Sequence, residues 1–336
     1  MDNKTLSIDV RRIQCSHELR ECTRGSDVDI VQLKAGRQQG LLAHVAIDGL
    51  AMSVGRFALD VRARGLINPN RITLGMMLAS PGHVTHWWED VRPGDVVITP
   101  PGAEMDAIYL SSAWYMTIAM DVSDLATALG GEDRLTDPAC WNKKGVRHVD
   151  PLLAETVRRR LAGISLNLKR STVTASGQAV DFLRRSIIEA FVMSSLNALP
   201  QDRAPPLSTG ARLVSEIESY VDAANGRPIH ISELCNALRV SRRTLHRVFI
   251  DALNMGPVSY LRRRRLSAAQ TALKRSDRLT TPIADIALEH GFPDPGRFAA
   301  YYRSFFCRIA IANAPIRRPE FALELIELAQ TARLGK

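Results

Sequence analysis

The stretch ISELCNALRVSRRTLHRVF, at residues 231–249, has the pattern of two short helices joined by a tight turn. Apolar residues recur at helical spacing through its first half, and Ser241 is placed to cap a second helix. One face of that second helix is apolar (Leu245, Val248, Phe249) and the other is cationic (Arg242, Arg243, His246, Arg247). This pattern is typical of a helix-turn-helix, although an amphipathic hairpin with a solvated basic face would share it.

A second stretch repeats this plan about fifty residues further along the chain. PIADIALEHGF starts at Pro282 and PDPGRFAAYYRSFF ends at Phe306, which again predicts a short helix, a tight turn and a second helix. Between the copies, YLRRRRLSAAQTALKRS at residues 260–276 predicts a long basic helix. Two such units on a stiff helix can place two reading helices in successive major grooves, about 34 Å apart.

The positive charge of the chain is concentrated in the same region. The 336 residues carry a net charge of +9, yet residues 1–204 hold 24 Lys or Arg against 23 Asp or Glu, and residues 205–336 hold 20 against 12. Such an excess at one end of a chain predicts contact with a polyanion. Nucleic acid is favoured over a membrane surface, because the run Arg262–Arg265 lacks the Trp- and Phe-rich apolar face of membrane-surface helices.

The length and composition predict two globular domains in a reducing compartment. Apolar residues make up 46% and charged residues 24% of the chain, and no apolar run approaches the roughly 18 residues that span a bilayer. The first 30 residues show no secretory signal. The five cysteines are scattered without a Cys-x-x-Cys pair, which favours reduced thiols over disulfides or a zinc site. We therefore expect a cytoplasmic protein without membrane contact.

Short apolar runs and turn-forming residues alternate through residues 28–121. Gly, Pro and Asn separate the runs, and Asp48-Gly49 lies between two of them as a two-residue hairpin turn. Many short strands at regular spacing predict an all-β sandwich or barrel. The predicted strands cover residues 28–33, 41–47, 50–57, 71–78, 96–99, 107–110 and 116–121.

Beyond residue 122 the pattern predicts helices at residues 124–129, 150–161 and 176–199. The last has an apolar stripe (Val180, Leu183, Ile187, Ala190, Phe191), which either packs on the β domain or pairs with a second copy in a dimer. PQDRAPPLS at residues 200–208 has the composition of a linker. The predicted organisation is an irregular segment (1–27), an effector and dimerisation domain (28–199), a linker (200–210), a helical domain (211–318) and a helical tail (319–336).

Residues 213–306 resemble the DNA-binding domain of the AraC/XylS family of bacterial transcription regulators. Beyond the opening stretch, the resemblance rests on Gly256-Pro257, Tyr260-Leu261, Arg265-Leu266, Ala269, Ile283–Ala287, Gly291-Phe292, Asp294 and Phe298. VRPGDVVITPPGAEMD at residues 91–106 is similar to the cupin-like effector domain of many family members. The resemblance implies an α+β two-domain fold, in which a cupin-like β-barrel or sandwich with a helical extension precedes an all-α double helix-turn-helix.

The resemblance also implies a sequence-specific regulator that binds double-stranded promoter or operator DNA, responds to a small-molecule effector, forms a homodimer and contacts RNA polymerase. The expected DNA contacts are Ser241, Arg242, Arg243, His246, Arg247, Arg262, Arg263, Arg297, Tyr301 and Arg303. Gly296 and Ala300 stand where the family commonly has Ser and Arg, so we expect the first reading helix to dominate base readout. After Phe306 the chain departs from the family pattern, because Cys307 replaces the usual Gly.

The effector site is expected in the β domain, lined by Arg56, Arg62, Arg71, Trp87 and Trp114, whose arginines predict an anionic effector. His83 and His86 lie three residues apart, which on a strand points them to opposite faces, so neither metal nor cofactor is predicted. We expect no enzymatic activity. Two alternatives remain, a cupin-type metalloenzyme with a basic tail and a nonspecific architectural DNA binder.

Overall fold

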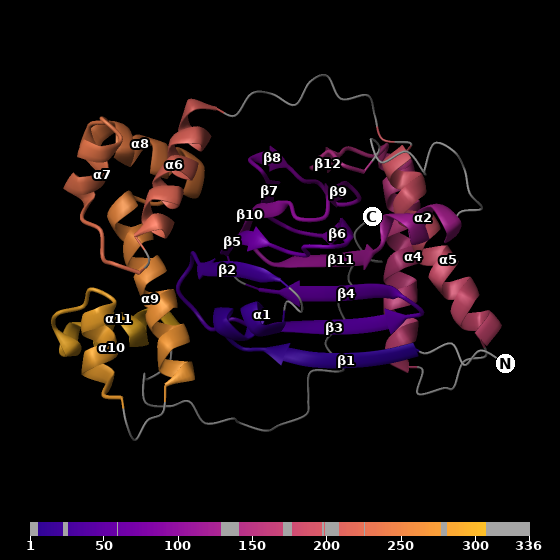
Figure 1. The fold of residues 1–336 in the computed structure, drawn as a ribbon, viewed down its shortest axis with the longest axis horizontal. Coiled ribbons are helices and arrows are strands. Elements are labelled where there is room, and N and C mark those ends of the chain that lie inside the picture. The colour runs from indigo at the N-terminus through magenta and orange to yellow at the C-terminus, as the bar shows by residue number, and fades with distance from the viewer. Residues whose placement is uncertain are drawn as a thin grey trace.

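The computed structural model describes residues 6–22, 26–58, 60–128, 141–170, 177–196, 198, 208–224, 226–276 and 281–306. A β sandwich forms its centre, with two long helices at one end and a group of helices from the C-terminal half at the other (Figure 1). Most of the predicted linker (residues 200–207) and everything after Phe306, including the predicted tail at 319–336 and the departure at Cys307, lie outside the described residues.

Two antiparallel sheets form the sandwich, so of the two predicted architectures the structure has the sandwich and not the closed barrel. In spatial order, the larger sheet consists of β1 (Leu6–Ile13), β3 (Gly40–Ile47), β4 (Leu50–Phe57), β11 (Ala113–Met120), β6 (Ile72–Ala79), β9 (Val96–Thr99) and β12 (Gly145–Arg147). The smaller sheet consists of β2 (Asp27–Gln32), β5 (Val61–Leu66), β10 (Glu104–Leu110), β7 (His83–His86) and β8 (Glu89–Asp90).

All seven predicted strands are present, and β4 and β9 have the predicted bounds. The hairpin between β3 and β4 turns at Asp48 and Gly49, whose φ angles of 44° and 81° are left-handed, as a two-residue hairpin turn requires. The expectation that residues 1–27 are irregular is wrong, because they contain β1 and α1 (Ser16–Cys22). β1 is an edge strand that pairs along its length with β3, and an edge strand buries too little to need a regular apolar pattern.

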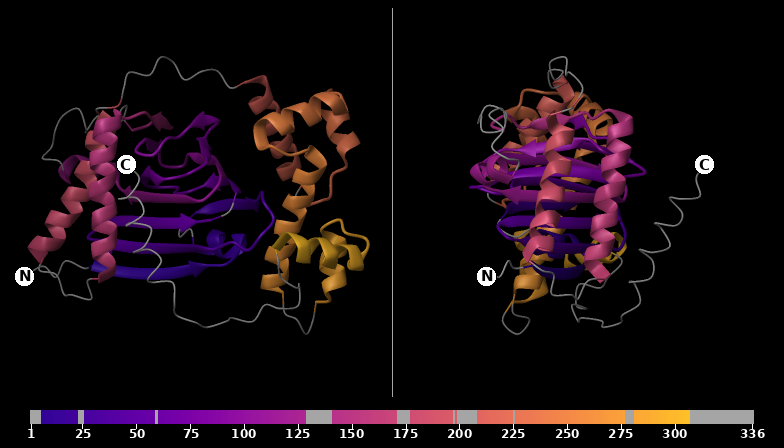
Figure 2. Two further views of the ribbon diagram at one scale, coloured as in Figure 1. Left: turned by 180° about the vertical axis from the view of Figure 1, so that it is seen from behind. Right: turned by 90° about the vertical axis from the view of Figure 1, so that its right-hand side faces the viewer.

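Three helices cover the larger sheet on its outer face: α2 (Val122–Ala128), α4 (Pro151–Arg170) and α5 (Gly177–Leu196). The two long helices α4 and α5 lie side by side (Figure 2). Val180, Ile187 and Phe191 of the predicted stripe are buried there against strand residues such as Met52 and Met116. The stripe therefore packs on the β domain. No helix within the described ranges is both long and apolar enough to cross a membrane.

The C-terminal half forms the two predicted helical units. The first contains α6 (Thr209–Ala223), α7 (Ile231–Ala237) and α8 (Arg242–Leu253), and the second contains α10 (Ile283–Glu289) and α11 (Pro295–Phe306), with α9 (Pro257–Arg275) between them. Ser241 caps α8 as predicted, because its side chain accepts a hydrogen bond from the Thr244 N–H at 3.0 Å. Each unit has its own core, one around Leu245 and Phe249 and the other around Phe298 and Tyr302.

The turn Pro93-Gly94-Asp95 contacts the start of α4 and the segment that precedes it. Gly94 has a φ of +98°, and a Cβ at this position would lie 2.4 Å from the Cβ of Ala154. The buried carboxylate of Asp95 accepts hydrogen bonds from the Arg92 N–H at 2.8 Å, from Nδ1 of His148 at 2.9 Å and from the Val149 N–H at 3.2 Å. One side chain thus joins the strand that follows the turn to the segment that leads into α4.

We expect Asp95→Ala to lower the free energy of unfolding by about 3 kcal/mol, since three N–H groups would lose a charged acceptor in a partly buried place. Asp90→Ala is the matched control, because Asp90 is 66% exposed and its one recorded ion pair, with His83, spans 3.4 Å. The control should lose less than about 0.5 kcal/mol. Urea unfolding followed by circular dichroism checks both values, and equal losses would contradict the role given to Asp95.

Candidate nucleic-acid interface and ligand cavity

The cationic face of α8 is open to solvent. Arg242, Arg243, His246 and Arg247 are exposed, whereas Leu245, Val248 and Phe249 on the opposite face are buried. The predicted core face of this helix is therefore confirmed, and its contacts with DNA remain a prediction. An arginine guanidinium can donate two hydrogen bonds to O6 and N7 of guanine in the major groove. Arg242 and Arg243, at the N-terminal end of α8, have the chemistry for that readout.

The second reading helix, α11, is capped by Asp294, whose Oδ1 accepts the Arg297 N–H at 3.0 Å. Arg297 and Arg303 are exposed, and Tyr301 is 37% exposed with the Arg262 guanidinium 4.7 Å from its ring centre. The intervening helix α9 has 19 residues. At 1.5 Å per residue it is about 28 Å long, comparable to the spacing of successive major grooves.

The four arginines at 262–265 point in different directions and have different partners, because successive residues on a helix are turned by about 100°. Arg262 and Arg263 both lie beside α11, and the Arg262 partner Tyr301 is exposed. Burial lowers the pKa of Arg263, whose guanidinium packs against Phe305 and Met255. Its contact with DNA remains a prediction. The recorded partners are Tyr301 for Arg262, Phe305 and Met255 for Arg263, Asp222 and Asp29 for Arg264, and the Gly291 carbonyl for Arg265.

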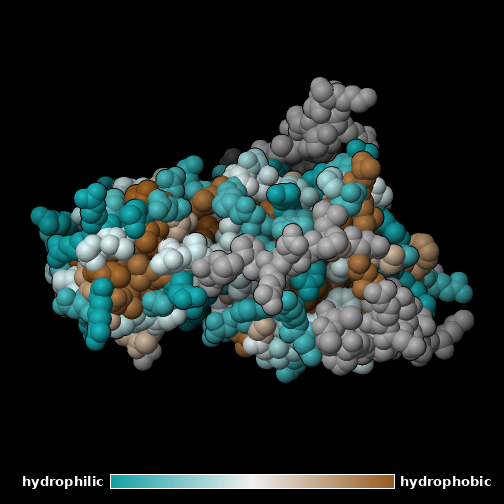
Figure 3. Space-filling view, turned by 90° about the horizontal axis from the view of Figure 1, so that it is seen from above, coloured by the Kyte–Doolittle hydropathy of each residue, from teal (hydrophilic) through white to brown (hydrophobic). Residues whose placement is uncertain are grey.

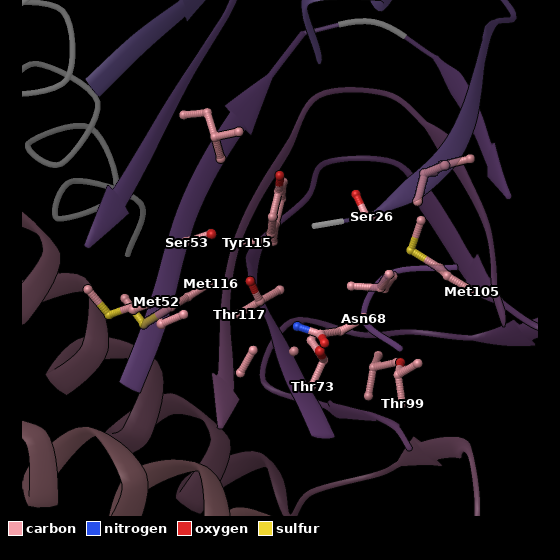
Figure 4. A pocket seen from close by; sticks show the side chains of 18 of the residues that line it. Ser26, Met52, Ser53, Asn68, Thr73, Thr99, Met105, Tyr115, Met116 and Thr117 are labelled. Carbon is pink, nitrogen blue, oxygen red and sulfur yellow. The ribbon is translucent and has the colours of Figure 1, made fainter. Parts of the chain in front are cut away.

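A cavity of about 290 Å³ lies between the two sheets of the sandwich. Figure 4 shows Tyr115 and Thr117 of β11 and Asn68 and Thr73 around this space, with Met105 of β10 on the facing side. His86 of β7 also lines it and is within hydrogen-bond distance of the Tyr109 hydroxyl, 3.1 Å from its Nε2. Burial, together with the charge of Arg62, lowers the pKa of His86 to about 4, so its imidazole is neutral at pH 7.

The five residues predicted to bind the effector do not lie on this cavity. The alternation of strands explains two of them, because Phe57 of β4 and Val61 and Ala63 of β5 line the cavity and leave Arg56 and Arg62 on the opposite faces. The prediction of an anionic effector therefore loses its basis.

The other three predicted effector residues have partners elsewhere. Arg71 lies 3.8 Å from Asp121, Trp87 donates to the Glu104 carbonyl at 2.9 Å, and Trp114 packs on the core that faces the helices. His83 and His86 do lie on different sides of their strand, since His83 is exposed and His86 is buried. Within the described ranges no three His, Cys, Asp or Glu side chains are grouped to hold a metal ion.

The smaller sheet separates the cavity from the C-terminal helices by a single layer of strands. Val61 and Ala63 of β5 line the cavity, and Arg62 and Arg64, between and after them, reach α6 on the other side. In β2, Ile30 lines the cavity and Val31 joins the core around Phe249. Each strand therefore has one face toward the cavity and one toward the helix-turn-helix.

Arg62 is the centre of the contact between the sandwich and the helices. Its guanidinium is 2% exposed and donates to both carboxylate oxygens of Glu218, at 3.0 and 2.7 Å, as well as to Asp106. Burial opposes the charge on Arg62, but the two carboxylates outweigh it and raise the pKa of Arg62. Burial likewise would raise the pKa of Glu218, and Arg62 lowers it instead. The Tyr260 hydroxyl of α9 donates to the same Glu218 carboxylate.

Polar contacts surround this buried pair. Trp88 Nε1 donates to the Ser215 hydroxyl at 3.1 Å, and Arg264 joins Asp222 of α6 to Asp29 of β2. α1 contacts α9 through Lys274, which donates to Glu18 at 2.8 Å. The segment expected to be irregular thus supplies part of the interface between the two halves.

The sequence interpretation missed Glu218 and gave Tyr260 no role beyond its place in the resemblance. One signal was available for Glu218, since it lies four residues after Val214 and three before Val221, on the apolar side of α6. An acidic residue in such a position needs a buried cation. Nothing local in the sequence identifies Arg62 as that cation.

Comparisons with known proteins agree with the helix-turn-helix. A family model described as a helix-turn-helix domain matches residues 234–309. The XylDLEGF operon transcriptional activator 1 of Pseudomonas putida is 23% identical over 282 residues, which cover 81% of this chain and 84% of that protein. The HTH-type transcriptional regulator GbdR of Pseudomonas aeruginosa is 30% identical over 128 residues, covering 37% of this chain and 34% of that protein. The crystal structure of the AraC-like transcriptional activator CuxR aligns with a TM-score of 0.41 at 17% identity, covering 78% of this chain and 95% of the other.

We expect the neutral His86 to make stability fall with acid. Its folded pKa of about 4 lies below the unfolded value of 6.5, so the unfolded state binds the proton first as the pH falls. Between pH 7 and pH 4, protonation of His86 in the unfolded state should lower the free energy of unfolding by about 3 kcal/mol. The His86→Gln variant should not show this part of the decrease. The measurement is urea unfolding at several pH values, with the exposed His83→Gln as control. A His86→Gln profile parallel to that of the unmodified chain would refute the assignment.

Proposed function

Because this chain belongs to the AraC/XylS family of transcription regulators, we propose that it recognises a specific DNA site through α8 and α11 and so controls transcription in the bacterial cytoplasm. The observation that carries this proposal is the exposed cationic face of α8, held rigidly by a buried opposite face and a capped N-terminus. We assign base readout to Arg242, Arg243 and His246. The other proposed contacts with DNA are Ser241, Arg247, Arg262, Arg297, Tyr301 and Arg303.

We further propose that residues 6–199 form an effector-binding unit and residues 208–306 a DNA-binding unit. The cavity between the sheets is the effector site in this proposal, and no catalytic role is assigned to it. The smaller sheet supports a coupling between the two sites, because its strands contact the cavity on one face and α6 on the other. An effector can change DNA binding only if it favours one arrangement of this contact over another.

We also propose that the protein works as a homodimer through its α4 and α5 end. Phe182 and Met193 of α5 and Leu152 of α4 are 74%, 45% and 81% exposed, an apolar set away from the DNA-reading end. Figure 3 shows hydrophobic patches on the surface at both ends of the molecule. Contact with RNA polymerase is part of the proposal because relatives of this chain carry the name transcriptional activator.

The assignment of these DNA contacts predicts a loss of binding affinity that depends on the DNA sequence. Against a site selected from a random DNA pool, Arg242→Ala or Arg243→Ala should weaken binding by about 1–3 kcal/mol and relax the choice at one base pair. Arg212→Ala is the control, since Arg212 is exposed on α6 outside both reading helices. Fluorescence anisotropy at fixed salt measures the affinities. A loss that is equal for all sequences would favour the architectural binder instead.

The coupling assignment predicts a strong pairwise energy across the interface. In a double-mutant cycle of Arg62→Met and Glu218→Gln, the coupling energy from urea unfolding should be about 2–4 kcal/mol, because either single change leaves a buried charge without its partner. Arg64→Met and Asp222→Asn form the matched cycle on the same strand and helix, with side chains 24% and 48% exposed. That cycle should give less than about 1 kcal/mol. Equal coupling in both cycles would show that the interface does not depend on Arg62.

A further inference from the structure

The charge of the cavity wall, as far as the structure describes it, limits which ligands it can hold. None of its lining residues in the described part of the chain is Lys or Arg, and its one carboxylate, on Asp9, is paired with Arg11 at 3.2 Å. Arg62 lies behind the wall, but its guanidinium is bound to the two carboxylates of Glu218 and Asp106. An anion entering the cavity would therefore find no lysine or arginine on the described wall, and the arginines nearest to it are already paired with carboxylates.

Two buried polar atoms of the wall lack a hydrogen-bond partner. They are Oγ1 of Thr73, on the larger sheet, and Nδ1 of His86, on the smaller sheet. Their residues are 4% and 7% exposed, and both line the cavity. Buried polar atoms in folded proteins almost always have partners, so both atoms identify positions where a ligand can supply one. A hydroxyl or an amide can donate to either atom.

We propose that the cavity binds an uncharged, mostly apolar organic molecule with a hydroxyl or amide group and discriminates against carboxylates. The proposal rests on the proposed function in that it names the effector class of the same site. Burying a carboxylate without a cation costs more than its hydrogen bonds to neutral groups return. The apolar part of such a ligand is matched by Leu42, Phe57, Val61 and Ile30 on the surrounding strands.

The test compares three molecules of one shape, 4-propylphenol, 4-propylbenzamide and 4-propylbenzoate, by isothermal titration of the full chain at pH 7.5. The phenol and the amide should bind, and the benzoate should bind at least about tenfold more weakly because its charge is not compensated. Equal or tighter binding of the benzoate, or binding of none of the three, would overturn the proposal. This comparison uses the unmodified chain, so it does not depend on a variant that folds.

A pair of isosteric variants locates the binding. Thr73→Val should weaken the phenol and the amide about three- to tenfold through the loss of one hydrogen bond. Thr85→Val is the control, because the Thr85 hydroxyl is also buried and unpartnered but does not line the cavity. Equal effects of both changes would place the ligand elsewhere and refute the assignment to this cavity.

DNA binding is measured in parallel to separate the two proposals. If the phenol binds but its saturation leaves the affinity for the selected DNA site unchanged, the effector role fails while the ligand class stands. If the benzoate binds best, the ligand class fails whatever happens to DNA binding.

Discussion

The buried guanidinium of Arg62 is the interaction on which the arrangement of the two halves depends. A charge that is 2% exposed is tolerated only with compensating carboxylates, and Glu218, itself 2% exposed, has the same need. Each group therefore requires the other, although they come from a strand of the sandwich and a helix of the DNA-binding half. Since Tyr260 donates to the same carboxylate, one cluster fixes β5, α6 and α9 together. α8 packs on α6, so the direction of its reading face depends on this cluster too.

Local signals in the sequence were sufficient to predict most of the helices, strands and turns. The cap at Ser241, the turn at Asp48-Gly49 and the apolar faces of α8 and α11 depend on near neighbours, and the structure contains all of them. β5 could not be predicted, because VRARGL carries two arginines whose burial depends on partners far along the chain. Arg62 and Glu218 are 156 residues apart. The arginines predicted for the effector site were misplaced for the same reason, because the local sequence does not show which face of the sheet Arg56 and Arg62 occupy.

Net charge was a good guide to the presence of a DNA-binding region and a poor guide to its contacts. Several cations of this region form bonds within the molecule, including Arg264 with Asp222, Lys274 with Glu18 and Arg227 with Glu233. The run of four arginines was the most prominent basic feature of the sequence, and two of its members bind the Asp222 carboxylate and the Gly291 carbonyl. Cations such as Arg242 on α8 and Arg297 on α11 remain exposed, and charge counts overestimate the surface available to phosphate.

The smaller sheet is a single layer of strands, so any movement of β5 affects both the cavity on one face and α6 on the other. Val61 and Ala63 line the cavity while Arg62, between them, makes hydrogen bonds of 3.0 and 2.7 Å to α6. A displacement of roughly 1 Å along or across this strand would take such bonds beyond the range in which they retain their strength. The packed contact between β5 and α6 leaves little room for that displacement, because close-packed interiors deform little and rearrange between discrete packings. A ligand that moves Val61 or Ala63 must therefore either break the Arg62 pair or carry α6 with it. Either outcome alters the contact between the sandwich and α6, the helix on which α8 packs.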